Sequence, residues 1–116
     1  MATTINLMWE GVTPEQYDEV RKIVGWETSP ATGGIFHVAS FGPAYTPGVD
    51  GALYVTDIWE SQSAFDTFVS ERLMPAVQQV GIGSEPKIVT LEMHTTFLPD
   101  ASKLEALQRP LAGAAH

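Results

Sequence analysis

The 116-residue chain predicts an α+β domain whose elements follow the order β-α-β-β-α-β. The first observation behind this is an internal repeat: residues 5–18 read INLMWEGVTPEQYD and residues 53–66 read LYVTDIWESQSAFD. Each copy is an apolar run that ends in Trp-Glu, followed by a polar turn and a helix start. The second observation is that another strand-like stretch follows each helix. Two such units form a ferredoxin-like sandwich, with two helices on one face of an antiparallel sheet.

The first unit begins with a strand at residues 4–9 and continues into a helix at residues 14–24. Thr13 is a suitable N-cap, because Gln16 three residues later completes a capping box and a proline follows the cap directly. Apolar residues recur inside the helix at spacings of three and four, which predicts one buried stripe. Gly25 is placed to end the helix in a left-handed conformation.

The second unit contains strands at residues 35–41 and 52–59, which a connection rich in proline and glycine joins. A second helix, capped by a serine, extends to about residue 80, and Pro75 should kink or break it. A fourth strand is expected over residues 87–98. The second helix presents a stripe of apolar residues to the core: Ala64, Phe65, Phe68, Val69, Leu73, Ala76 and Val80.

The remaining residues form a tail. The ferredoxin-like α/β-barrel domain is expected to span residues 1–98, and residues 99–116 a C-terminal tail with a short helix. Ser102 and Glu105 have the spacing of a capping box, which predicts a helix over residues 103–108. The last six residues are expected to fray.

One face of the predicted sheet is left uncovered by the two helices. That face still carries aromatic and aliphatic side chains on several strands, and a monomer would leave this apolar surface in water. We therefore expect a homodimer through the open sheet face, related by a two-fold axis.

Composition excludes several classes of partner. Fourteen acidic against six basic residues give a net charge of −8, whereas nucleic-acid binding needs a basic surface. No apolar run approaches the roughly 20 residues that span a membrane, and the N-terminus lacks the basic flank of a signal peptide. The partners are therefore expected to include neither nucleic acid nor membrane. The chain has no cysteine, which excludes disulfides and favours a cytoplasmic location.

Residues 57–69, DIWESQSAFDTFV, resemble the antibiotic biosynthesis monooxygenase-like (ABM-like) branch of the dimeric α/β-barrel superfamily. In that branch a strand ends in Trp, and a polar cap and an Ala-Phe pair then open the helix. The resemblance implies that two sheets pair back to back into a barrel. It also implies a pocket for a small hydrophobic, aromatic or polyketide-like molecule between the helices and the sheet of each subunit. Activities across the superfamily include cofactor-independent oxygenation, haem degradation, polyketide cyclisation and isomerisation.

The resemblance implies roles for individual residues of this chain. Trp59 matches the strand-end Trp that lines the pocket of the oxygenases, and Asn6 resembles an Asn on the first strand of the haem degraders. Val55 stands four residues before Trp59, where the oxygenases often have Asn, and its side chain cannot hydrogen-bond a substrate oxygen. The second helix contains no histidine to bind haem iron.

Two histidines are candidate general bases. An even pairing register that sets His37 opposite Val55 would place His37, Asp57 and Trp59 on one face of the sheet. An imidazole beside a carboxylate is a suitable base because the acid orients the ring; the alternative is a structural hydrogen bond at the sheet end. His94, on the polar face of the last predicted strand, is either a pocket residue, a polar contact at the dimer interface or simply exposed.

Aromatic side chains suit a flat ligand, because rings stack on one another. The candidate ligand contacts are therefore the rings of Tyr17, Phe65 and Phe68, together with Trp59 and Asn6, which the resemblance implies. The alternative for each ring is core packing. No histidine spacing typical of a metal site occurs, and neither a dinucleotide-binding nor a phosphate-loop motif is present. We expect neither a metal nor a cofactor.

Three hypotheses of function remain open. In the first, the chain is a cofactor-independent monooxygenase in which His37 or His94 deprotonates a phenol or quinol, and the anion reacts with oxygen in a dry pocket beside Trp59. In the second, a polyketide cyclase or isomerase uses the same pocket for proton transfer alone. In the third, the protein is a non-catalytic ligand-binding or structural dimer.

Overall fold

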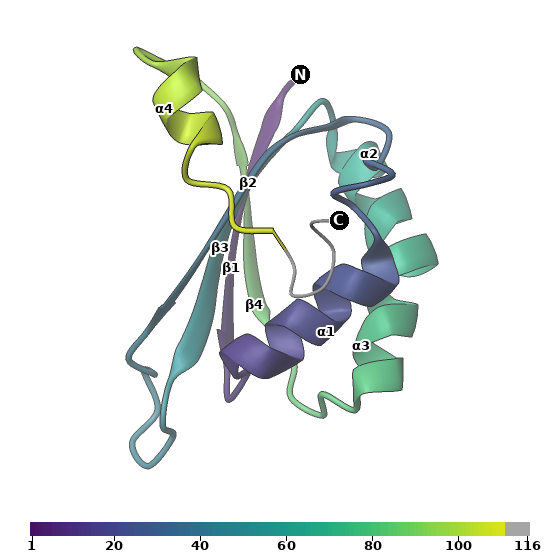
Figure 1. Ribbon diagram of the computed structural model, residues 1–116, viewed down its shortest axis with the longest axis vertical. Coiled ribbons are helices and arrows are strands. Elements are labelled where there is room, and N and C mark those ends of the chain that lie inside the picture. The colour runs from purple at the N-terminus through teal and green to yellow at the C-terminus, as the bar shows by residue number, and fades with distance from the viewer. Residues whose placement is uncertain (111–116) are drawn as a thin grey trace.

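The computed structural model describes residues 1–110. Its strands are β1 (Thr3–Glu10), β2 (Gly34–Gly42), β3 (Ala52–Trp59) and β4 (Lys87–Glu92). Its helices are α1 (Pro14–Val24), α2 (Gln62–Phe68), the π-helical turn η1 (Val69–Leu73), α3 (Met74–Val80) and α4 (Ala101–Glu105). The strands form one antiparallel sheet in the order β2-β3-β1-β4, and α1, α2 and α3 form a second layer on one side of it (Figure 1). The predicted ferredoxin-like architecture is confirmed.

The core lies between the sheet and this helical layer. Burial alternates along β1, so that every second residue from Thr3 to Trp9 is buried, as expected for a strand with one covered face. One core cluster lies at the α3 end of the layer and contains Leu7, Trp9, Val12, Leu53, Val55 and Val77. The other lies under α2 and contains Ile5, Ala31, Trp59, Phe65 and Phe68.

Helix α1 begins and ends where the sequence predicts. The backbone N–H of Gln16 donates to Oγ1 of Thr13 over 3.1 Å, and the backbone N–H of Thr13 donates to Oε1 of Gln16 over 3.0 Å. These two bonds complete the predicted capping box. At the other end Gly25 has φ 67° and its N–H donates to the carbonyl of Arg21. Glycine adopts this left-handed conformation without steric cost.

The second predicted helix is interrupted just before Pro75, as expected. In η1 the N–H of Met74 donates to the carbonyl of Val69, five residues earlier, which is the pattern of a π-helical turn. The extra residue in this turn rotates the following helix relative to the preceding one. For this reason Val77, which an uninterrupted stripe leaves out, is buried beside Ala76.

The predicted bounds of two elements are wrong. The sequence predicts a fourth strand as far as residue 98, but β4 ends at Glu92. Glu92 is paired with Thr3, the first residue of β1, so the partner strand ends there. In the tail, α4 spans Ala101–Glu105 rather than residues 103–108.

The earlier start of α4 has a simple cause. Asp100, not Ser102, caps the helix: its Oδ1 accepts from the backbone N–H of Lys103 over 3.0 Å and from Oγ of Ser102 over 2.7 Å. An aspartate at the N-cap satisfies a backbone donor of the first turn. The expectation that the last six residues fray concerns positions outside the described residues.

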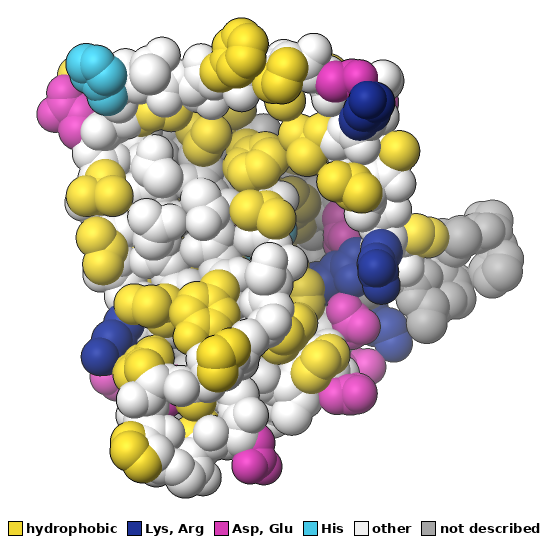
Figure 2. All heavy atoms as spheres, turned by 90° about the vertical axis from the view of Figure 1, so that its left-hand side faces the viewer, with side chains coloured by type: hydrophobic (Ala, Val, Ile, Leu, Met, Phe, Trp, Pro, Cys, Tyr) yellow, Lys and Arg dark blue, Asp and Glu magenta, His cyan; other side chains and the backbone are white. Residues whose placement is uncertain are grey.

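The open face of the sheet is turned away from the helices and faces the viewer in Figure 2. Hydrophobic side chains are spread over this face, and most of the charged ones lie towards its margins. Val38, Val89 and Leu91 are 43%, 44% and 48% exposed. The pairing registers assign the following residues to this face: Thr4, Asn6, Met8, Phe36, Val38, Ser40, Tyr54, Thr56, Ile58, Val89 and Leu91. Of the helices formed by residues 1–110, none has the length and apolar character needed to cross a membrane.

Candidate functional site

A row of hydrogen bonds links side chains from α1, β2 and β3. The hydroxyl oxygen of Tyr17 lies 2.6 Å from Nε2 of His37. On the other side of the imidazole, Nδ1 of His37 lies 2.7 Å from Oδ1 of Asp57. The second oxygen of that carboxylate, Oδ2, accepts a hydrogen bond of 3.1 Å from Nε1 of Trp59. We call Tyr17, His37, Asp57 and Trp59 the polar row.

The proton positions in the polar row follow from what each group can donate or accept. An ionised Asp57 can only accept, so it receives one hydrogen bond from Trp59 and one from Nδ1–H of His37. In a neutral imidazole the other nitrogen, Nε2, is then an acceptor and receives the hydroxyl hydrogen of Tyr17. Asp57 is 5% exposed, whereas 28% of the His37 side chain is exposed. The carboxylate therefore holds His37 in the tautomer that accepts a proton at Nε2.

The strand register explains why these groups meet. The sequence leaves the register of β2 on β3 open. The even register considered above sets His37 opposite Val55, but the structure pairs His37 with Asp57 and Val55 with Ala39. The long connection between β2 and β3 contains no two-residue turn that would set the register. Because a shift of two residues preserves side-chain direction, His37, Asp57 and Trp59 share one face, as they would in the even register considered above. Their catalytic role stays a prediction.

Tyr17 is held against the imidazole by packing on several sides. Its ring is nearly parallel to that of His37, with an interplanar angle of 7° and centroids 6.1 Å apart, and the ring of Phe41 meets it edge-on at 6.0 Å. The guanidinium carbon of Arg21 lies 5.8 Å from the Tyr17 ring centroid. Burial raises the pKa of Tyr17 to about 12, with Arg21 opposing and nearby carboxylates adding to the rise. Tyr17 is therefore a neutral phenol at neutral pH.

This raised pKa predicts how stability depends on alkaline pH. The folded protein holds the Tyr17 proton more tightly than the unfolded chain, whose tyrosines titrate near pH 10. The contribution of Tyr17 to the free energy of unfolding is therefore complete below pH 10 and is lost as the pH rises from 10 to about 12. Urea unfolding across this range measures the loss, and the Tyr17→Phe variant should lack it. Equal alkaline slopes for the two proteins would contradict the assignment.

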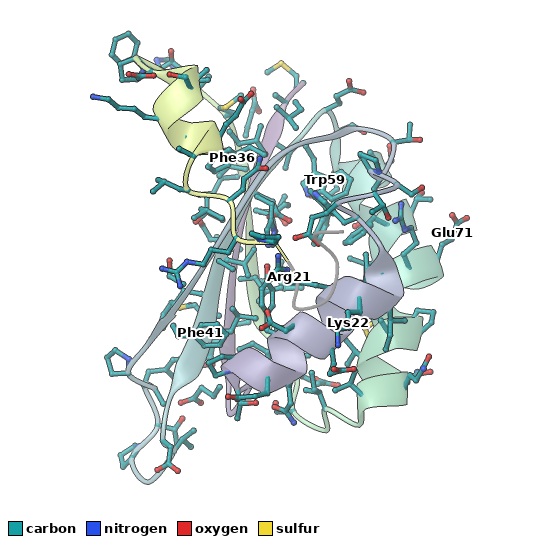
Figure 3. The ribbon with its side chains drawn as sticks, viewed as in Figure 1. Arg21, Lys22, Phe36, Phe41, Trp59 and Glu71 are labelled. Atoms are coloured by element: carbon teal, nitrogen blue, oxygen red, sulfur yellow. The ribbon has the colours of Figure 1, made fainter. Side chains whose placement is uncertain are left out.

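Trp59 lies between the sheet and α2 (Figure 3), and none of its surface is exposed. The rings of Phe65 and Phe68 pack on it with centroid distances of 5.7 and 5.1 Å, and Trp26 meets it edge-on at 5.4 Å. Side chains therefore fill the space in which the sequence predicts a ligand pocket. The ligand-binding roles of Trp59, Phe65 and Phe68 stay predictions.

Trp26 is a residue of this region to which the sequence analysis assigns no role. Besides contacting Trp59, its ring lies 5.4 Å from the imidazole of His37. The available signal is its position directly after Gly25, because the residue that follows a left-handed helix cap commonly packs back on the last turn of the helix. Trp26 thereby covers one side of His37.

Two predicted site residues lie away from the polar row. Asn6 is on the open face of the sheet, opposite Thr56, and its Oδ1 accepts a hydrogen bond of 3.1 Å from Oγ1 of that threonine. His94 lies beyond the end of β4 and is exposed. The structure brings neither residue to His37, and their roles stay predictions. In the described part of the chain, no group of three or more His, Cys, Asp and Glu side chains is placed to hold a metal ion.

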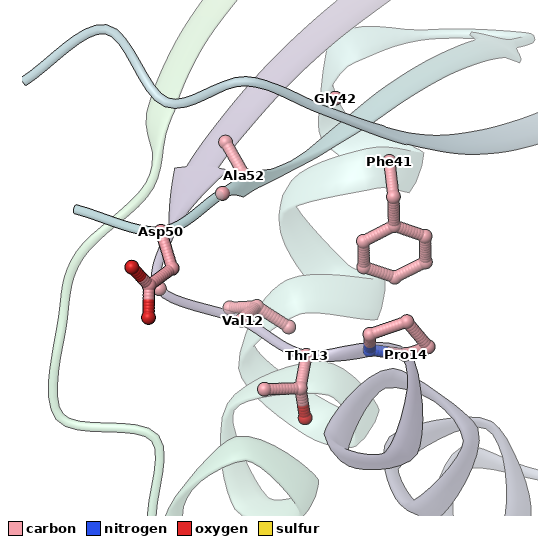
Figure 4. A pocket seen from close by; sticks show the side chains of 9 residues that line it. Val12, Thr13, Pro14, Phe41, Gly42, Asp50 and Ala52 are labelled. Atoms are coloured by element: carbon pink, nitrogen blue, oxygen red, sulfur yellow. The ribbon is translucent and has the colours of Figure 1, made fainter.

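A groove of about 510 Å³ opens at the N-terminal end of α1 (Figure 4). Pockets of this size accommodate small organic molecules. Figure 4 shows Phe41 and Pro14 at one end of the groove and Asp50 at the other. Sequence reasoning missed this groove because its walls meet only in the folded chain. They come from the turn after β1, the end of β2 and the start of β3: Gly11, Val12, Thr13, Pro14, Phe41, Gly42, Asp50, Gly51 and Ala52.

The proteins found to be similar to this chain are similar in structure rather than in sequence. No family model matches the chain, and no curated protein matches it in sequence. The chain is similar to SnoaB, a cofactor-independent oxygenase from Streptomyces nogalater, with a TM-score of 0.55 and 15% identity over 85% of this chain and 97% of SnoaB. It is also similar to a proposed antibiotic biosynthesis monooxygenase from Deinococcus radiodurans, with a TM-score of 0.52 and 15% identity over 84% of this chain and 97% of that one.

The chain shares with these proteins an α+β fold in which helices cover one face of a four-stranded antiparallel sheet. NE2512, a protein of unknown function from Nitrosomonas europaea, shares it with a TM-score of 0.59 and 16% identity over 85% of this chain and 95% of that one. The resemblance of residues 57–69 to ABM-like proteins is thus confirmed for the fold. Likenesses at these identities establish the fold alone, since one fold carries many activities.

Proposed function

We propose that the chain is an enzyme that binds a small aromatic molecule and removes a proton from its hydroxyl group. The observation that carries this proposal is the position of His37, whose Nδ1 is 2.7 Å from Asp57 and whose Nε2 is 2.6 Å from the phenol of Tyr17. A carboxylate that orients an imidazole is the usual support of a general base. The base thus already contacts a phenolic hydroxyl, the chemical group that it would deprotonate.

Proton removal would follow from the geometry of the polar row. Both ring nitrogens of His37 have partners, so a substrate hydroxyl reaches Nε2 either by displacing the Tyr17 hydroxyl or by passing its proton through it. The imidazolium that forms would be stabilised by the buried Asp57 carboxylate. Trp59 holds the second oxygen of that carboxylate and so keeps Asp57 aimed at His37.

Cofactor-independent oxygenation is the first candidate reaction. The phenolate of a quinol is electron-rich and can transfer electrons to dioxygen. In the balanced reaction, one quinol and one O₂ give one hydroxyquinone and one water: the substrate gains one oxygen atom and gives up two hydrogens. The shared fold with SnoaB and the ABM-like motif at residues 57–69 support this candidate.

Proton transfer without oxygen, as in a cyclase or isomerase, is the second candidate. Val55 favours it, because this buried apolar residue offers no hydrogen bond to hold a substrate oxygen. The polar row supplies a base and its support, which are sufficient for proton transfer.

The filled space around Trp59 favours the third hypothesis, a non-catalytic binding or structural role.

Oxygen uptake with a panel of naphthols and naphthohydroquinones, in air and under argon, tests the proposal. For an oxygenase we expect protein-dependent consumption of one O₂ per hydroxyquinone, without hydrogen peroxide. Spontaneous oxidation of a quinol releases hydrogen peroxide instead. The amount of peroxide therefore measures how much of the oxygen uptake is spontaneous. Conversion that continues under argon would select the isomerase or cyclase, and the absence of any protein-dependent conversion would contradict an enzymatic role.

We also propose that two copies pair through the open sheet face. The exposed apolar residues on β2 and β4, together with the scarcity of charge in the middle of that face (Figure 2), support this assembly. Sedimentation equilibrium of the wild type checks it, and a Leu91→Glu variant should shift the equilibrium towards the monomer.

A further inference from the structure

The groove at the start of α1 has a preformed floor. The N–H of Gly11 donates to the carbonyl of Gly51 over 2.9 Å, which joins the turn after β1 to the start of β3. Val12 and Ala52 are 4% and 1% exposed, so both belong to the packed interior. A ligand therefore meets a floor whose shape exists before binding, and little conformational entropy is lost on association.

The connection between β2 and β3 is also tied down. The carboxylate of Glu10 accepts the backbone N–H groups of Tyr45 and Thr46, over 3.0 and 2.7 Å, and the hydroxyl of Thr46 over 2.7 Å. Glu10 is the last residue of β1, directly before Gly11. The same end of β1 thus anchors the connection whose last part carries Asp50.

Phe41 belongs to both the groove and the surroundings of the polar row. Its side chain lines the groove, and its ring lies edge-on to Tyr17 at a centroid distance of 6.0 Å. The hydroxyl of Tyr17 in turn contacts Nε2 of His37. Phe41 therefore contacts both the groove and the ring of Tyr17.

The chemistry of the groove selects a class of ligand. Phe41 and Pro14 present apolar surface at one end, which suits a planar ring. Among the described residues that line the groove, Asp50 is the one charged side chain, and it is exposed at the other end. A carboxylate accepts hydrogen bonds from hydroxyl or amino groups and repels anions. The net charge of −8 acts in the same direction.

We propose that this groove is the docking site of the substrate, a neutral aromatic molecule with a hydrogen-bond donor, and that Phe41 is the gate between the groove and Tyr17. The inference rests on the proposed function, because it adds the docking site of the aromatic substrate. The donor group binds Asp50 while the ring stacks on Phe41. Rotation of Phe41, which is 42% exposed, brings the ring of the ligand to Tyr17. Side-chain rotations of exposed residues are fast.

Amide chemical shifts locate the docking site directly. We would titrate ¹⁵N-labelled protein with 2-naphthol, at millimolar concentration, and follow the amides of Gly11, Gly42 and Gly51, which line the groove. We expect saturable shifts at these three glycines, and weaker binding of the anion 2-naphthoate at the same positions. Shifts confined to the open sheet face, or no shifts at the three glycines, would overturn the proposal.

Variants identify the gate. Phe41→Ala should weaken 2-naphthol binding about tenfold, since a ring contact is lost. Phe36→Ala is the matched control, because Phe36 lies on the same strand but on its opposite face, and its affinity should match the wild type. Asp50→Asn should narrow the difference in affinity between 2-naphthol and 2-naphthoate. Unchanged 2-naphthol affinity in Phe41→Ala would overturn the role of Phe41.

The outcome separates this inference from the proposed function. Binding at the three glycines without conversion of any substrate would leave the docking site standing and remove the enzymatic proposal. Conversion that depends on His37 without shifts at these glycines would support the enzymatic proposal and remove the docking site.

Discussion

Replacing His37 with glutamine is expected to lower kcat for the converted phenol or quinol by about 10²–10⁴-fold, the usual contribution of a positioned general base. Glutamine retains a polar group beside Asp57 but cannot take up a proton near neutral pH. If the proton is removed in the transition state, kcat and kcat/KM should fall together while 2-naphthol affinity stays close to the wild-type value. Initial rates of product formation measure the effect.

The matched control for this prediction is His94→Gln. His94 is exposed beyond the end of β4, whereas His37 is part of the polar row, so we expect His94→Gln to keep the wild-type rate. Urea unfolding of both variants shows whether a lost rate reflects a lost fold. Wild-type rates in a folded His37→Gln protein would exclude His37 as the base, and a loss in His94→Gln alone would transfer that role to His94.

Replacing Trp59 with alanine is expected to have the largest effect on stability. Trp59 is fully buried and contacts Trp26, Phe65 and Phe68. Removing a buried Trp side chain costs about 3–5 kcal/mol through lost burial and the cavity left behind. Since domains of this size are stable by only about 5–15 kcal/mol, the variant should unfold at a much lower urea concentration. Urea unfolding followed by circular dichroism measures the change.

Trp59→Phe separates packing from hydrogen bonding. Phenylalanine restores much of the apolar volume but leaves Oδ2 of Asp57 without its donor. An unpaired buried polar group costs about 1–3 kcal/mol, so this variant should be intermediate between the wild type and Trp59→Ala. A loss below about 1 kcal/mol in Trp59→Ala would show that the site relaxes freely, which fits a ligand-lining position better than a core position.

Local signals in the sequence were sufficient for most of the fold. The capping box at Thr13, the glycine after α1 and the proline in the second helix each act over a few residues, and each is found where the sequence predicts. The two elements with wrong bounds depend on a distant strand or on a competing cap. β4 ends where its partner strand β1 begins. α4 starts early because Asp100, rather than Ser102, caps it.

The candidate site was predicted in part. Residue parity places Asp57 and Trp59 on one face of β3, because side chains alternate along a strand. Whether His37 shares that face depends on the register of β2 on β3, which the sequence left open and the structure decided. The pairing of β1 with β3 places Asn6 and Trp59 on opposite faces of the sheet, which the family resemblance does not reveal. No sequence pattern indicated that Tyr17 from α1 contacts His37, because α1 can pack on the sheet in more than one position.

The sequence by itself determined the order of the elements, the caps of α1 and the interruption before Pro75. These features follow from backbone chemistry and from periods of 2 and 3.6 residues, which local sequence encodes. The tertiary structure alone decided that Tyr17 contacts His37, that rings fill the space beside Trp59, and that a groove opens between Pro14, Phe41 and Asp50. Each of these depends on how closely elements distant in sequence approach one another, and side-chain volumes and strand register set that approach only when the whole core packs.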